Sequence, residues 1–326
     1  MSTSLLEVRD LRVTLNTSRG PADALRGLSF ALDRGETLGV VGESGCGKSM
    51  LALTLMGLLP EGARVSGSLR FEGRELLAQD EAAWCRLRGD RIAMVFQEPM
   101  TALNPLHTIG RQVAEPLRLH RGLDAVAARA EALRLLEQVR LPQAARRLDA
   151  HPHQLSGGQR QRVVIAMALA CQPDLLIADE PTTALDVTLQ REILQLIADL
   201  VAERHMALML ISHDLAVIAR NVRRVMVMYG GLGVEQGPAG EVLHRPMHPY
   251  TRGLLAARPR LGAARGERLQ TIPGRVPELV DLPTGCPFAD RCAHREAVCE
   301  APPSMRPVAE GHEVACLRWE TLGPKG

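Results

Sequence analysis

A glycine-rich segment, residues 42–49, limits most strongly how this chain can fold. The apolar run at residues 37–41 predicts a buried strand before the segment, and residues 50–59 predict a helix after it. Strand, loop and helix stand in the order that a phosphate-binding loop requires, so we predict an α/β core. The segment has the full pattern G-x-x-x-x-G-K-[ST] of such a loop, and its residues are Gly42, Glu43, Ser44, Gly45, Cys46, Gly47, Lys48 and Ser49.

Lysine usage points to the same segment. Lysine occurs only at positions 48 and 325 among the 39 basic residues of the chain. A compact ammonium fits beside the β- and γ-phosphates of a nucleotide, whereas arginine is a wide planar fork. The loop's backbone N–H groups and the start of the following helix favour the same anion. The segment therefore predicts a nucleoside triphosphate, with Lys48 at its phosphates.

Two acidic residues end a second apolar run. Residues 175–178 are apolar and predict a strand, and Asp179 and Glu180 follow directly. In a phosphate-loop protein the first acid helps to hold Mg²⁺, and the second can orient or deprotonate the attacking water. An ordinary strand end with solvated acids is the alternative. Gln97, after the apolar residues 92–96, could give an oxygen to the metal and sense the γ-phosphate, although alone it would be read as a surface residue.

A second glycine pattern decides the family. Ser156, Gly157, Gly158 and Gln159 follow Leu155 and precede a helical run, and they predict a second anion site at a helix start. One nucleotide does not need two such sites, but two make sense if each chain's second site closes on a nucleotide held by another chain. Here the sequence resembles the ATP-binding cassette (ABC) ATPases, whose signature is this pentapeptide. The resemblance covers residues 5 to 320.

The remaining elements of the family appear in order. The D-loop matches Ala184-Leu185-Asp186, and the switch histidine matches His213. The resemblance implies an α/β phosphate-loop NTPase core with antiparallel β and helical subdomains, plus a small cysteine-containing C-terminal appendix. We expect a nucleotide-binding domain at residues 1–260, with a helical insertion at about 98–170, and the appendix at 261–326. Within the insertion one helical stripe predicts a buried face: Leu123, Val126, Ala130, Leu133 and Leu136.

The resemblance also implies roles for the site residues. Two cassettes pair head to tail and trap two ATP molecules, so this chain needs a partner cassette. Lys48 would neutralise the phosphates, and Ser49, Gln97 and Asp179 would serve Mg²⁺. Glu180 would act as the general base. His213 would contact the γ-phosphate, and the signature, from Ser156 through Gly157 and Gly158 to Gln159, would reach the partner's nucleotide.

Three further stretches are similar to one branch of the family, the oligopeptide and dipeptide importers, which also includes nickel importers. They are residues 98–105, His248-Pro249-Tyr250 and Ile272-Pro273-Gly274. The branch implies peptide uptake with two membrane permeases, a second and different ATPase subunit, and an extracytoplasmic solute-binding protein that acts indirectly. Uptake of nickel or another solute is the first alternative. A soluble ABC ATPase that acts on nucleic acid or ribosomes is the second.

Composition argues against nucleic acid and against a membrane span. Aromatic residues make up 2% of the chain and the formal net charge is +2, so neither base stacking nor a basic surface is indicated. No run of eighteen apolar residues occurs, and residues 1–7 lack the features of a signal peptide. We therefore expect a cytoplasmic protein, held at the cytoplasmic face of the membrane by its permeases.

Four of the seven cysteines lie near the C-terminus: Cys286, Cys292, Cys299 and Cys316. Four thiolates can hold an iron–sulfur cluster or zinc. C-x-x-C knuckles are absent, disulfides are not expected in the cytoplasm, and unligated thiols remain an alternative. The importer resemblance favours a [4Fe–4S] cluster.

Two details of the nucleotide site depart from a simple pattern. Cassettes often place an aromatic residue before the phosphate loop to stack on adenine, whereas this chain offers Leu15. Cys46 lies at a helix start near Lys48, which would lower the pKa of its thiol and make it reactive. The alternative is that only its backbone matters.

Overall fold

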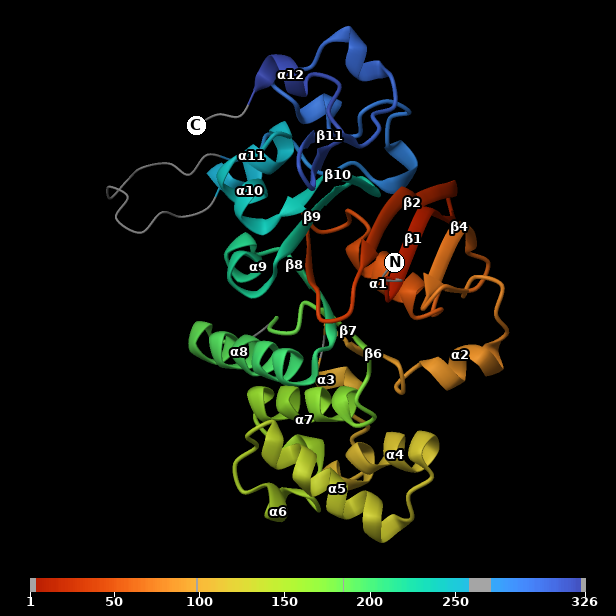
Figure 1. The fold of residues 1–326 in the computed structure, drawn as a ribbon, viewed down its shortest axis with the longest axis vertical. Coiled ribbons are helices and arrows are strands. Elements are labelled where there is room, and N and C mark those ends of the chain that lie inside the picture. The colour runs from red at the N-terminus through yellow and green to blue at the C-terminus, as the bar shows by residue number, and fades with distance from the viewer. Residues whose placement is uncertain (1–3, 98, 184, 258–270, 324–326) are drawn as a thin grey trace. The chain divides into compact units, whose positions relative to one another are not determined.

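The computed structural model describes residues 4–97, 99–183, 185–257 and 271–323. It divides the chain into two compact units, and each gathers segments that are far apart in the sequence. Unit 1 consists mainly of Leu32–Glu36 and Ala78–Ile211, and unit 2 of Leu6–Ala31, Thr37–Leu77 and the chain from Ser212 onward. Figure 1 follows the elements of both by colour along the chain. The expected boundary near residue 260 lies outside the described residues.

Unit 1 contains a parallel sheet in the order β8-β7-β6. Its strands are β6 (Ile92–Val95), β7 (Leu175–Asp179) and β8 (Ala207–Ser212). Every residue of the three strands is buried, as continuous apolar runs in a parallel sheet require. The carboxyl end of β7 is Asp179, so the sheet brings the predicted acidic pair to its edge.

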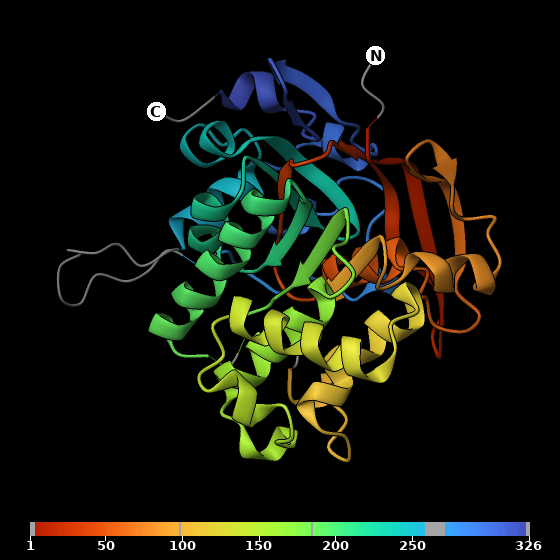
Figure 2. The ribbon, with the colours of Figure 1, turned by 60° about the horizontal axis from the view of Figure 1, so that its bottom comes forward.

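Helices make up most of the rest of unit 1, and α4 packs on α5 and α7 (Figure 2). Three long helices start at side chains that accept backbone hydrogen bonds, namely Thr108, Asp124 and Asp186. The helices are α2 (Glu81–Leu87), α3 (Pro99–Ala102), α4 (Ile109–Arg121), α5 (Ala125–Gln138), α6 (Ala144–Arg147), α7 (Gly157–Leu169) and α8 (Val187–Arg204), with the 3₁₀ turn η1 (Pro152–Gln154).

The predicted buried stripe, which begins just before α5, is wrong except at Leu136. Val126 is 81% exposed, while Ala128, Ala132, Leu135 and Leu136 are buried. The buried face is rotated from the predicted one, and half of its four buried residues are alanines instead of larger apolar residues. Hydrophobic periodicity gives weight to large apolar residues, so it does not indicate a face formed partly by alanines.

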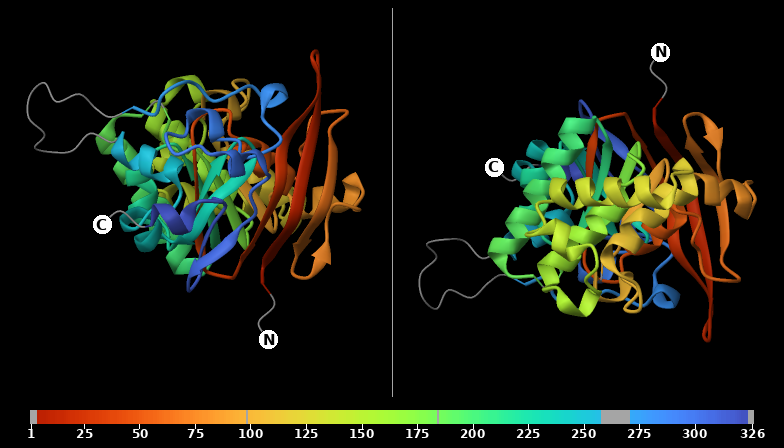
Figure 3. Two further views of the ribbon diagram at one scale, coloured as in Figure 1. Left: turned by 90° about the horizontal axis from the view of Figure 1, so that it is seen from above. Right: turned by 90° about the horizontal axis from the view of Figure 1, so that it is seen from below.

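Unit 2 contains an antiparallel sheet and a mixed sheet. The antiparallel sheet has the order β2-β1-β4-β5, and its long strands run side by side in Figure 3. The mixed sheet has the order β11-β12-β10-β9-β3, with β3 parallel to β9. The strands are β1 (Leu6–Thr17), β2 (Gly20–Leu32), β3 (Thr37–Val41), β4 (Arg64–Phe71), β5 (Arg74–Glu75), β9 (Arg224–Tyr229), β10 (Leu232–Pro238), β11 (Arg306–Ala309) and β12 (His312–Val314).

The helices of unit 2 include the one that follows the phosphate-binding loop. This helix, α1, begins at Lys48 and ends at Leu55, earlier than predicted, and Gly57 just beyond it has φ of 61°. Among the described residues, no helix has the length and apolar character needed to cross a bilayer. The helices are α1 (Lys48–Leu55), α9 (Leu215–Asn221), α10 (Ala239–His244), α11 (Pro249–Ala256) and α12 (Trp319–Leu322), with the 3₁₀ turns η2 (Leu279–Asp281), η3 (Ala289–Arg291) and η4 (Ala297–Glu300).

Candidate functional site

The phosphate-binding loop of unit 2 connects β3 to α1, as the sequence predicts. Gly47 precedes the helix with φ of 103°, and a Cβ there would lie 2.7 Å from the carbonyl oxygen of Ala24. Only glycine fits this conformation and this close approach. Ser44, Gly45 and Ser49 are exposed, so this part of the loop is open to a ligand.

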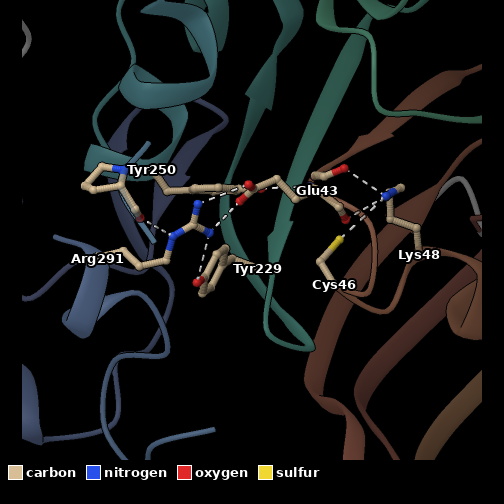
Figure 4. Close-up of polar contacts among 8 residues, drawn as sticks. Glu43, Cys46, Lys48, Tyr229, Tyr250 and Arg291 are labelled. Atoms are coloured by element: carbon tan, nitrogen blue, oxygen red, sulfur yellow. Dashed lines mark hydrogen bonds and ion pairs between the residues drawn. The ribbon is translucent and has the colours of Figure 1, made fainter. Parts of the chain in front are cut away.

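Lys48 is buried at the base of the loop. Its side chain donates hydrogen bonds to the carbonyl oxygens of Gly42, at 2.8 Å, and Glu43, at 3.0 Å. Its ammonium also lies 3.8 Å from the Sγ of Cys46 (Figure 4). The loop thus holds a single compact cation next to its exposed residues, an arrangement suited to a phosphate chain.

The surroundings of Cys46 argue against the reactive thiol that its position suggested. The residue is 0% exposed, and burial raises the pKa of its thiol although Lys48 acts in the opposite direction. A buried thiol with a raised pKa is a poor nucleophile. The structure therefore favours the alternative, in which the backbone of Cys46 matters: its carbonyl oxygen accepts a hydrogen bond from Gly231 N–H at 3.1 Å.

Unit 1 places Gln97 beside Glu180. The Nε2 of Gln97 donates to the Oε2 of Glu180 at 3.3 Å, and the hydroxyl of Thr183 donates to the same oxygen at 3.0 Å. Glu180 has φ of 45°, and its N–H donates to the carbonyl oxygen of Ile211 on β8. Asp179 is nearly fully buried at the end of β7. Residues that follow β6 and β7 therefore meet at one edge of the parallel sheet.

The predicted signature forms a helix start. Ser156 caps α7: its hydroxyl accepts from Gln159 N–H at 3.4 Å, and the Oε1 of Gln159 accepts from Ser156 N–H at 3.2 Å. This reciprocal pair is a capping box. Gly157 and Gly158 lie in the first turn, where a helix attracts anions. A Cβ on Gly158 would lie 2.3 Å from Leu189 of α8, so glycine lets the two helices approach.

Two further predicted elements are loop residues. His213 follows β8 and is exposed, and the N–H of Asp214 next to it donates to the hydroxyl of Ser212 at 3.0 Å. In the predicted D-loop, Ala184 lies outside the described residues. Asp186 caps α8 by accepting hydrogen bonds from the N–H groups of Thr188 and Leu189.

The four C-terminal cysteines line one small cavity of unit 2, about 20 Å³ in volume. All seven cysteines of the chain are free thiols. Burial, with a smaller effect from the other three thiols, raises the pKa of Cys286 to about 11. Within the described ranges, no three ligand side chains are arranged to hold a single metal ion. The four predicted cysteines thus line one cavity without forming a recognisable metal-ion site in the described part of the chain.

The sequence analysis missed residues behind the phosphate-binding loop. Tyr250 accepts a hydrogen bond from Glu43 N–H at 2.8 Å, and Arg291 binds the carboxylate of Glu43 (Figure 4). Composition carried one signal. The chain has two tyrosines and four phenylalanines, and both tyrosines pack together with Phe288.

Two family models match the chain. The ABC transporter model matches residues 25–183, and the model for the C-terminal region of oligopeptide/dipeptide transporters matches residues 234–299. Among curated relatives, the oligopeptide transport ATP-binding protein OppD of Escherichia coli is 49% identical over 97% of this chain and 93% of its own length. A putative peptide import ATP-binding protein of Brucella ovis is 47% identical over 98% of both chains.

Solved structures agree with the cassette fold. An ATP-binding cassette solved as a dimer, in a post-hydrolysis state bound to ADP and Pi, is 30% identical with a TM-score of 0.64, and covers 72% of this chain and 98% of its own. The CbiO1 protein of Clostridium perfringens, part of an ABC transporter complex, is 28% identical with a TM-score of 0.63, and covers 74% of this chain and 90% of its own.

Proposed function

This chain belongs to the ATP-binding cassette family, in the branch with the oligopeptide/dipeptide transporter C-terminal region, and on this premise we propose that it hydrolyses ATP to drive peptide uptake. The observation that carries the proposal is the presence of both regions on one chain, with 49% identity to OppD over nearly the whole of both proteins. A cassette alone would fit many ATPases. The C-terminal region narrows the choice to importers of this kind.

The phosphates of ATP are assigned to residues 42–49. Lys48 would exchange its contacts with the carbonyl oxygens of Gly42 and Glu43 for oxygens of the β- and γ-phosphates. Ser49, Gln97 and Asp179 offer hydroxyl, amide and carboxylate oxygens, the hard ligands that suit Mg²⁺. Bound Mg²⁺ would neutralise charge on the phosphates during hydrolysis.

Glu180 is assigned as the general base. Hydrogen bonds from Gln97 and Thr183 fix its carboxylate, so a water at the γ-phosphate would meet an oriented acceptor. Gln97 is thus assigned two roles: it senses the γ-phosphate, and its hydrogen bond positions the carboxylate of Glu180. His213 is assigned to contact the γ-phosphate from the loop after β8.

The signature residues are assigned to a nucleotide held by another cassette. The capped start of α7 presents Ser156, Gly157 and Gly158, with Gln159 locked by the capping box. We expect the partner to be a second ATPase subunit with a different sequence. Two membrane permeases would hold both at the cytoplasmic face of the membrane, and an extracytoplasmic solute-binding protein would act indirectly.

The C-terminal cysteines are assigned to a [4Fe–4S] cluster. Cys286, Cys292, Cys299 and Cys316 supply the four thiols that such a cluster takes, and they surround one cavity. A cluster spreads its ligands over several iron atoms, so it does not need the spacing of a single-ion site. The support for this assignment is the importer resemblance together with the shared lining of the cavity.

Uptake in the strain of origin tests the function. Cells that lack this chain should lose uptake of a labelled oligopeptide, and the wild-type chain should restore it. Glu180→Gln should bind ATP but lower its turnover by about 10²–10⁴-fold, because a neutral amide cannot accept the proton. Uptake should therefore not return with this variant.

Nickel uptake in the same cells provides the comparison. Loss of nickel uptake with intact peptide uptake would favour the nickel importer. Loss of neither would favour a soluble ATPase that acts on nucleic acid or ribosomes. Near-normal ATP turnover by Glu180→Gln would refute the assignment of the base.

A further inference from the structure

An aromatic cluster lies behind the phosphate-binding loop in unit 2. Tyr229 at the end of β9 meets Tyr250 of α11 edge-on, with ring centroids 4.7 Å apart. Phe288 lies 5.2 Å from the ring of Tyr229 and 5.3 Å from that of Tyr250. All three side chains are buried. The chain has few aromatic residues, and both of its tyrosines and one of its four phenylalanines lie in this cluster.

Arg291 connects this cluster to the loop. Its two terminal nitrogens donate to the two carboxylate oxygens of Glu43, at 2.7 and 3.1 Å. Its Nε donates to the carbonyl oxygen of Pro273 at 2.8 Å, and one terminal nitrogen also contacts the hydroxyl of Tyr229 at 3.3 Å. The side chain is 5% exposed. Burial alone would lower the pKa of Arg291, but the hydrogen bonds to Glu43 and Tyr229 outweigh it and raise the pKa.

Every polar group of Glu43 is therefore held. The N–H donates to the hydroxyl of Tyr250, the carbonyl oxygen accepts from Lys48, and the carboxylate binds Arg291. Figure 4 shows the carboxylate pointing toward Arg291, on the side away from Lys48. Two of these three partners come from the C-terminal part of the chain. They fix the conformation of the loop's second residue and the direction of its charge.

The direction of this charge matters for nucleotide binding. A carboxylate in the loop would repel the phosphates if it turned toward them, and would compete with them for Lys48. A bidentate guanidinium neutralises the carboxylate and restricts its geometry at the same time. Arg291 is well suited to this because its guanidinium is planar and buried, and each of its three nitrogens donates a hydrogen bond.

We propose that Arg291 and Tyr250 are positioning residues for the phosphate-binding loop, acting through Glu43, and that nucleotide binding is thereby linked to the order of the C-terminal region. The inference rests on the assignment of ATP to this loop. Linkage is reciprocal: if the C-terminal region favours the binding conformation, a bound nucleotide stabilises the C-terminal region equally. Arg291 is the last residue of η3, and Cys292 directly follows it. One short turn therefore carries both the arginine that binds Glu43 and a cysteine that lines the cavity.

A double-mutant cycle that neutralises each charge in turn, on the full chain, tests the positioning role. The affinity for MgADP, which is not hydrolysed, is measured by calorimetry. Arg291→Gln should weaken binding by about tenfold, because the carboxylate of Glu43 is left unpaired near the phosphates. Adding Glu43→Gln should bring the affinity back to within about threefold of wild type, since the unpaired charge is removed. Arg295→Gln, which breaks an exposed ion pair with Asp290, is the matched control and should not change affinity.

Two results would overturn the positioning role. Unchanged affinity in Arg291→Gln would show that the pair does not affect the loop. A double variant that binds as weakly as Arg291→Gln would show a packing defect instead of misdirected charge. A wild-type chain that fails to bind MgADP would refute the ATP assignment itself, and so separates the two failures.

Hydrogen exchange tests the linkage, and decides the case even if Arg291→Gln does not fold. MgADP should slow exchange in residues 271–323 of the wild-type chain. Tyr250→Phe, which removes only the hydroxyl that accepts from Glu43, should reduce this protection and weaken binding by about threefold. Exchange in residues 271–323 that does not respond to MgADP would overturn the linkage.

Discussion

Burial decides the chemistry of Cys46, the one thiol in the phosphate-binding loop. It is close to Lys48, whose charge favours a thiolate, but the cost of burying that thiolate is larger and raises the pKa. Cys85 on α2 is instead exposed to solvent. Because a thiolate must form and be reached before it reacts, the two cysteines should differ strongly in reactivity.

We expect iodoacetamide to modify Cys85 at least about tenfold faster than Cys46 in the native chain. Mass spectrometry of peptides taken at increasing times measures both rates in one sample. Denatured chain is the control, since the two rates should become similar there. Equal rates in the native chain would show that Cys46 is accessible and that burial does not protect it.

At the residue scale, local patterns could be predicted from the sequence, whereas long-range pairs could not. The pattern of residues 42–49 is local, because its chemistry and spacing lie within eight consecutive positions, and it could be predicted. The pair of Arg291 and Glu43 spans 248 positions, and no local pattern indicates it. An arginine in a turn looks like a surface residue until the fold buries it.

At the scale of elements, the packing of α7 on α8 depends on one glycine. A Cβ on Gly158 would lie 2.3 and 2.9 Å from the two methyl groups of Leu189, whereas a Cβ on Gly157 would only make an ordinary contact with Leu185 at 3.7 Å. Gly158→Ala should therefore lower the free energy of unfolding by about 1–3 kcal/mol, measured by urea denaturation. Gly157→Ala should be neutral or slightly stabilising, because alanine favours a helix where nothing obstructs it.

A second variant separates this clash from other effects of the added methyl group. Leu189→Ala should make Gly158→Ala less damaging than it is alone, since the obstructing methyl groups are gone. Equal stability of the Gly157 and Gly158 variants would contradict the packing argument.

Helices and strands were predictable where a short stretch of sequence contained the apolar pattern or the capping residues that form them. The strands at residues 37–41 and 175–179 are apolar runs in a buried sheet, and the capping residues of α7 stand in the sequence itself. The face of α5 was not predictable in this way. Its buried side is formed partly by alanines, whose burial depends on how close α4 and α7 lie and not on the hydrophobicity of the stripe.

At the scale of the whole molecule, the chain passes between its two units several times. Lys48 and His213 belong to unit 2, whereas Gln97, Asp179 and Glu180 belong to unit 1. The family resemblance could name all five from sequence, because it transfers a complete arrangement. Composition and periodicity alone could not show which segments form each unit.

The metal content of the purified chain tests the assignment of the four C-terminal cysteines. Purified without oxygen, the chain should contain about four iron atoms and four sulfides, with the broad visible absorption of a cluster. Cys299→Ser should lose the iron because Cys299 lines the cavity, whereas Cys85→Ser, on an exposed cysteine of unit 1, should keep it. A content of one zinc ion per chain would instead indicate a single-ion zinc site and would refute the cluster. A preparation with neither metal would leave four unligated thiols, and the raised pKa of Cys286 would then keep that thiol protonated at neutral pH.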